Sequence, residues 1–204
     1  MGVGSNTMAT RIRDRWRNAG QPVPLEENAK ALAYVCWQLA LTSARNLHAE
    51  DYIYDDDQQR VGVIREYLIF LVHVADRLAF DILGEDDRPE FVSALAYNCG
   101  SQLQRNASEI LGSGDYRDAF ITALNDCNSD YGQCSFQSGL PGYSLLRVFG
   151  DRVKAIMGDN QTNRWVIDQV MEIDGPDLAK RLSKSFSNLV KGSLVDEPRD
   201  GFSP

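Results

Sequence analysis

Residues 61 to 83 read VGVIREYLIFLVHVADRLAFDIL, and this stretch decides the fold. Its apolar residues cover most of the circumference of a helix, which is typical of a helix enclosed by other helices. The same stretch also carries ionisable side chains, namely Arg65, Glu66, His73, Asp76, Arg77 and Asp81. A buried charge must be paired, lie at a solvated cleft or serve a function, so any functional interpretation starts at this helix.

The helical period continues through most of the chain after residue 25, as in the series Phe91, Leu95, Cys99 and Leu103. No comparable run alternates apolar and polar residues with a period of two. The sequence therefore predicts an all-α, single-domain bundle of seven or eight helices around a central helix at about 58–84. The helices are expected near 9–18, 26–50, 58–84, 89–112, 115–136, 143–158, 161–174 and 176–191, with a stop and restart at 174–177 and a joining loop at 132–142.

Three regions are expected along the chain: a basic arm over 1–20, the helical bundle over 21–191 and a disordered tail over 192–204. The 204 residues carry a net charge of −8, which disfavours binding to nucleic acids and to anionic membrane surfaces. No apolar run reaches about 18 residues, and the N-terminus does not resemble a signal peptide. We therefore expect a cytoplasmic protein without a membrane span, whose four cysteines are reduced core thiols.

The charged residues of the central helix form the main candidate for a ligand site. At about 100° per residue, Glu66, His73 and Arg77 fall within about 40° of one another, and Asp76 lies on their flank. A carboxylate beside an imidazole and a guanidinium could bind a ligand or act as a general base at a cleft. The alternative is structural: the same residues could form a solvent-facing polar stripe or a buried network of ion pairs.

Metal and cofactor motifs do not support an assignment. Neither His48 nor His73 is preceded by the Glu-x-x spacing of di-iron bundles, and two histidines are too few for a histidine-rich zinc site. The stretch from Asp126 to Gly132 nearly matches the start of a calcium loop, but Tyr131 stands where that loop needs glycine. No cofactor, metal ligand or catalytic residue is predicted, and the balance is against an enzyme.

The N-terminal arm is the third candidate, because it places Trp16 among Arg11, Arg13, Arg15 and Arg17. On an acidic protein, these residues are expected to dock on acidic surface of the same chain, of a second copy or of a protein partner. The leading hypothesis is thus a non-catalytic protein that acts by self-association or by binding a protein partner. One alternative is a small-ligand binder or enzyme with a pocket beside the central helix, and another is a nucleic-acid-associated accessory protein.

Overall fold

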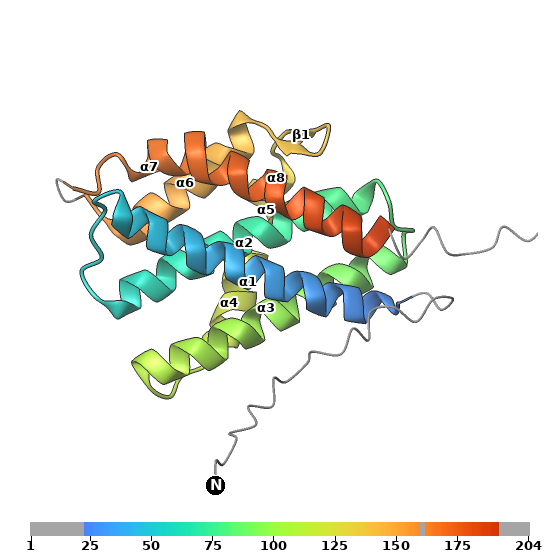
Figure 1. Cartoon of the computed structure of the whole chain (residues 1–204), viewed down its shortest axis with the longest axis horizontal. Coiled ribbons are helices and arrows are strands. Elements are labelled where there is room, and N and C mark those ends of the chain that lie inside the picture. The colour runs from blue at the N-terminus through green and yellow to red at the C-terminus, as the bar shows by residue number, and fades with distance from the viewer. Residues whose placement is uncertain (1–22, 160–161, 192–204) are drawn as a thin grey trace, which may run out of the picture.

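The computed structural model describes residues 23–159 and 162–191, and they form an all-α fold (Figure 1). In chain order the elements are α1 (Leu25–Ala49), α2 (Asp57–Phe80), α3 (Asp87–Leu111), α4 (Tyr116–Asp126), α5 (Asn128–Gly132), β1 (Phe136–Gln137), β2 (Leu140–Pro141), α6 (Tyr143–Met157), α7 (Val166–Gln169), the π-helical turn η1 (Val170–Asp174), α8 (Gly175–Phe186) and the π-helical turn η2 (Ser187–Lys191). The predicted fold class is confirmed.

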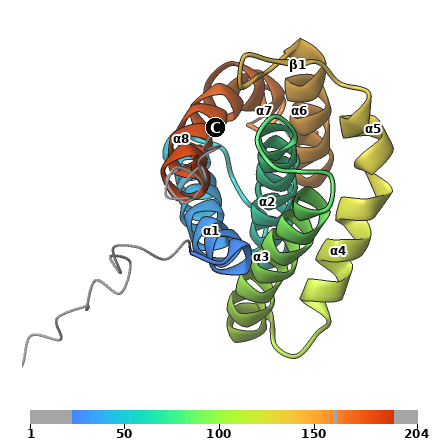
Figure 2. The same cartoon turned by 90° about the vertical axis from the view of Figure 1, so that its right-hand side faces the viewer.

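Helix α2 is the central helix, as predicted from the sequence. In Figure 2 it lies in the middle of the fold, and it contacts α1, α3, α4, α6 and α8. Every residue from Glu66 to Ala75 is buried. The helix begins at a standard N-cap, because the Asp56 carboxylate accepts a hydrogen bond of 2.7 Å from the backbone N–H of Gln59.

Aromatic side chains join α2 to α6. Phe70 stacks on Phe149 with 4.2 Å between ring centroids, and Tyr67 meets the same ring edge-on at 5.0 Å. Gly150, the next residue of α6, is where this helix approaches the α7–η1 segment. A Cβ at this position would lie 2.8 Å from Ile167, so only glycine allows the two segments to pack this closely.

The predicted helix over 115–136 is divided in two. Helix α4 ends at Asp126, the chain bends at Cys127, and α5 ends at Gly132. Asn, Asp, Ser and Gly are poor helix formers, and their concentration here accounts for the bend. The joining segment contains a short hairpin that pairs Phe136 with Pro141, and its turn uses the positive φ angles of Ser138 and Gly139.

The predicted stop at 174–177 is wrong. Asp174 and Gly175 both have helical dihedral angles, so the chain runs from η1 directly into α8. Pro176 lies in the first turn of α8, directly after the π-helical turn η1, where the regular α-helical hydrogen bonding is already interrupted.

The basic arm, the helix expected near 9–18 and the C-terminal tail over 192–204 lie outside the described residues. None of the described helices combines the length and the hydropathy that a bilayer-spanning helix requires.

Candidate functional site

The four predicted site residues of α2 do not gather around one pocket. Glu66 and His73 are buried and face α5 and α6. Asp76 and Arg77 are partly exposed and contact α3 and the C-terminal end of α5. The structure therefore divides the predicted site into a buried pair and two partly exposed residues that hold α3 and α5 against α2.

Glu66 is only 1% exposed and lies between two guanidinium groups. Arg65 donates from Nε and Nη2 to Glu66 Oε1 at 3.1 and 2.9 Å. Arg152 of α6 donates from Nε to Glu66 Oε2 at 2.7 Å. Both carboxylate oxygens are thus engaged, which offsets the desolvation of a charge in the interior.

His73 stacks on Tyr131 of α5, with 4.3 Å between ring centroids, and its Nε2 lies 3.7 Å from Cys127 Sγ. Burial lowers the pKa of His73 to about 4, with Asp76 acting in the opposite direction and Arg152 and Arg77 adding to the lowering. Burial also raises the pKa of the Cys127 thiol. The pair is therefore a neutral imidazole beside a neutral thiol at pH 7, unlike the ion pair of a cysteine nucleophile.

These residues form one group, which we call the polar cluster: Arg65, Glu66, His73, Cys127, Tyr131 and Arg152. The Tyr131 hydroxyl is buried and has no hydrogen-bond partner among the described residues. The charge of Arg152 acts on the pKa values of His73, Cys127 and Tyr131, which shows that the members lie close together. The sequence could not reveal Arg152 or Tyr131 as members, because they come from distant segments.

Asp76 and Arg77 connect α2 to neighbouring helices through hydrogen bonds. Asp76 accepts two hydrogen bonds of 2.8 Å from Nε and Nη2 of Arg88. This is the bidentate geometry that carboxylates and guanidinium groups favour. Arg77 Nη2 donates to the carbonyls of Tyr131 at 3.1 Å and Gly132 at 2.7 Å, at the carbonyl end of α5. Both side chains hold neighbouring segments against α2.

A second polar contact lies in the interior between α2 and η1. The Tyr67 hydroxyl donates to Asp174 Oδ2, and Gln169 Nε2 donates to Oδ1 of the same carboxyl at 3.3 Å. Burial raises the pKa of Asp174, and the hydrogen bonds from Tyr67 and Gln169 act in the opposite direction. This contact fixes the π-helical turn to the central helix.

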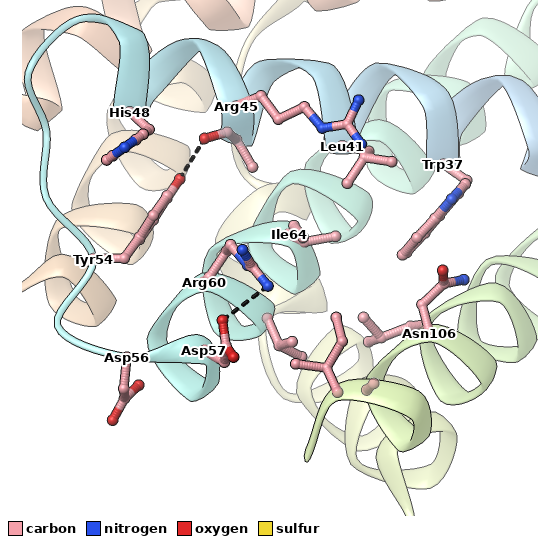
Figure 3. A pocket seen from close by; sticks show the side chains of 15 residues that line it. Trp37, Leu41, Arg45, His48, Tyr54, Asp56, Asp57, Arg60, Ile64 and Asn106 are labelled. Atoms are coloured by element: carbon pink, nitrogen blue, oxygen red, sulfur yellow. Dashed lines mark hydrogen bonds and ion pairs between the residues drawn. The ribbon is translucent and has the colours of Figure 1, made fainter. Parts of the chain in front are cut away.

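A pocket of about 810 Å³ lies between α1, the first turns of α2 and the last turns of α3 (Figure 3). It is lined by Trp37, Leu41, Ala44, Arg45, His48, Tyr54, Asp56, Asp57, Arg60, Val61, Ile64, Leu103, Asn106, Ala107 and Ile110. We call it the α1–α2–α3 pocket. Most of these side chains are apolar, and the buried face of Trp37 forms one wall.

The polar residues lie mainly at the rim of the pocket. Arg60 Nη2 pairs with Asp57 Oδ1 at 2.8 Å, and the Tyr54 hydroxyl donates to the carbonyl of Ala44 at 2.8 Å. Asp56 caps α2. Arg45 is exposed and extends along α1 toward Leu41 in Figure 3. A pocket in the size range of about 300–1,000 Å³ that combines apolar walls with polar groups is typical of small-molecule sites.

Sequence reasoning missed this pocket, although α1 carries a signal for it. Trp37, Leu41, Ala44 and His48 follow each other at steps of four, three and four, which places them on one face of the helix. That face is turned away from Leu32, and it is buried at Trp37 and Ala44, partly exposed at Leu41 and exposed at His48. A second apolar stripe that ends in histidine indicates an incompletely covered face.

No protein-family model matches this chain, and neither a curated protein nor a solved structure matches it.

In the described ranges, no three His, Cys, Asp or Glu side chains are grouped closely enough to hold a metal ion. The predicted partner-binding residues Arg11, Arg13, Arg15, Trp16 and Arg17 lie outside those ranges. Association through the arm therefore stays a prediction.

Proposed function

We propose that this protein binds a small, largely apolar molecule in the α1–α2–α3 pocket. The observation that carries the proposal is the pocket itself, an opening of about 810 Å³ beside the central helix whose lining is mostly apolar. Apolar surface left uncovered in water has an unfavourable free energy of about 25 cal/mol per Å², so a ligand that covers it gains affinity. This proposal keeps the sequence-based idea of a pocket beside α2 but assigns it to other residues.

Binding is favoured over catalysis because most polar groups at the pocket are engaged in structural contacts. The Asp57 carboxylate pairs with Arg60, and the Tyr54 hydroxyl donates to a backbone carbonyl. Asp56 accepts a hydrogen bond from the backbone of α2. A general base must reach the proton that it removes, and a carboxylate already paired or capping a helix is poorly placed for this task.

The test is a fluorescence titration of the full chain with the neutral apolar probe N-phenyl-1-naphthylamine. We expect saturable, one-to-one binding with a dissociation constant in the micromolar range. Leu41→Gln places an amide on the pocket wall and should weaken binding about five-fold, equivalent to about 1 kcal/mol.

Ile173→Gln is the matched control, because Ile173 is also an apolar residue, 57% exposed, but belongs to η1 and not to the pocket. It should leave probe binding unchanged. Circular dichroism checks that both variants are folded. The proposal is wrong if the probe does not bind, or if the two substitutions weaken binding equally.

A further inference from the structure

Arg45 differs from every other arginine in residues 23–159 and 162–191. Each of the others has a hydrogen bond, an ion pair or a ring contact; Arg152, for example, pairs with Glu66, and Arg164 lies over the ring of Trp165. The remaining arginines that make such a contact are Arg60, Arg65, Arg77, Arg88, Arg105, Arg117, Arg147 and Arg181. Arg45 makes none of these contacts with the described part of the chain, although it lines the pocket.

The lack of a partner is notable because the protein has a net charge of −8. The acidic side chains that also line the pocket have other roles, since Asp57 pairs with Arg60 and Asp56 accepts the N-cap hydrogen bond from Gln59. A guanidinium group offers several N–H donors in one plane and matches the two oxygens of a carboxylate. The rim of the pocket therefore presents an uncommitted cation that fits an anionic group.

The interior of the pocket has the opposite character. Ile64, Leu103 and Trp37 are each less than a tenth exposed, and they come from three different helices. The small part of these side chains that borders the pocket is apolar, as is the partly exposed Leu41, so a ligand that lies against them must have an apolar body. Figure 3 shows that Arg45 and Trp37 both project from α1 and border the same opening.

We propose that the ligand of this pocket is an anionic amphiphile, a small molecule with one carboxylate-type head group and an aliphatic or aromatic body. The head group pairs with Arg45 at the rim, and the body lies against Trp37, Leu41 and Leu103. This inference rests on the proposed binding function, and it adds the chemical class of the ligand. It predicts that the charge of the head group contributes to affinity through one arginine.

The experiment compares decanoate with 1-decanol, which share a chain length and differ in charge. Each competes with N-phenyl-1-naphthylamine for the full-length protein. We expect decanoate to displace the probe at a concentration about five- to ten-fold lower than decanol does, as a charge-assisted hydrogen bond implies. Raising the sodium chloride concentration from 50 to 500 mM should weaken only decanoate binding, because salt screens an exposed ion pair.

Arg45→Gln should remove the preference for decanoate and leave decanol binding within about two-fold of the unchanged protein. Arg105→Gln is the matched control, because it removes one exposed arginine from α3 outside the pocket lining. It should change the binding of neither compound.

The possible outcomes separate the two proposals. Equal displacement by decanoate and decanol, or an equal loss of both in Arg45→Gln, would overturn the anionic class while the pocket still binds the probe. A failure of the probe itself to bind would overturn the binding function. Light scattering tests whether a second copy of the chain occupies the pocket. A dimer in solution that Leu41→Gln dissociates would identify the pocket as an interface between two copies and would overturn both proposals.

Discussion

The polar cluster and the α1–α2–α3 pocket lie at different sides of helix α2, and they differ in whether their arginines are paired. At the polar cluster, Arg65 and Arg152 are committed to the buried carboxylate of Glu66. At the rim of the α1–α2–α3 pocket, Arg45 is exposed and makes no hydrogen bond, ion pair or ring contact with the described residues. The polar cluster has the more unusual combination of side chains, but it is buried. The α1–α2–α3 pocket has simpler chemistry, and it is the site that we propose for a ligand.

This difference has a physical cause. Taking a charge out of water costs several kcal/mol, so a buried charge is stable only when its partners are already in place. A site that binds must retain groups that are still hydrated before the ligand arrives. The polar cluster accordingly contributes to fold stability, whereas the pocket is the site that we propose for a ligand.

The largest effect is expected at Glu66. Glu66→Gln removes the charge that neutralises two partly buried guanidinium groups and should lower the free energy of unfolding by about 3 kcal/mol. Urea denaturation monitored by circular dichroism measures this change.

Two controls sharpen the comparison. Asp151→Asn breaks an exposed ion pair with Arg147 on α6, and Arg45→Gln removes the unpaired cation of the pocket. Each should change the free energy of unfolding by less than about 0.5 kcal/mol. If Glu66→Gln proved as mild as these controls, the polar cluster would have no special structural role.

The pH dependence of stability should carry the signature of His73. Its pKa of about 4 in the folded protein lies below the value of about 6.5 for an unfolded chain, so the unfolded state takes up the proton first. The resulting stabilisation is complete above pH 6.5 and is lost as the pH falls toward 4, by about 3 kcal/mol in total. His73→Phe keeps the stacking on Tyr131 and should flatten the stability curve over this range.

The measurement compares urea unfolding of both proteins at several pH values, each referenced to its own stability at pH 7. Other titrating groups cancel in the difference. NMR titration of the His73 ring in the unchanged protein gives an independent value, and a pKa above 6 would contradict the buried, neutral state.

The smallest effect is expected at two buried tyrosines. Tyr131→Phe removes a hydroxyl that has no partner among the described residues, so it should raise the free energy of unfolding by about 1 kcal/mol. Tyr67→Phe should lower it by about 1 to 2 kcal/mol, because Asp174 then loses a hydrogen bond in the interior. Thermal unfolding distinguishes the two, and a destabilised Tyr131→Phe would show that its hydroxyl has a partner in solution.

The site was only partly predictable. The 3.6-residue period correctly placed Glu66 and His73 on one face of a buried helix, and a buried network was one of the two alternatives considered. Arg77 shares that face and, like His73, contacts α5, but it does so by donating to the backbone carbonyls of Tyr131 and Gly132. Arg152 and Tyr131 could not be assigned, since helical periodicity relates residues within a helix and not between helices.

The sequence by itself determined that the chain is helical and that a helix at about 58–84 forms its centre, which the structure places at Asp57–Phe80. These features follow from local periodicity and from helix propensity, which neighbouring residues encode. Only the tertiary structure decided which charges are paired and which remain available. That outcome depends on which helices meet side by side, and residues as far apart as Glu66 and Arg152, or Trp37 and Leu103, come together only when the chain packs.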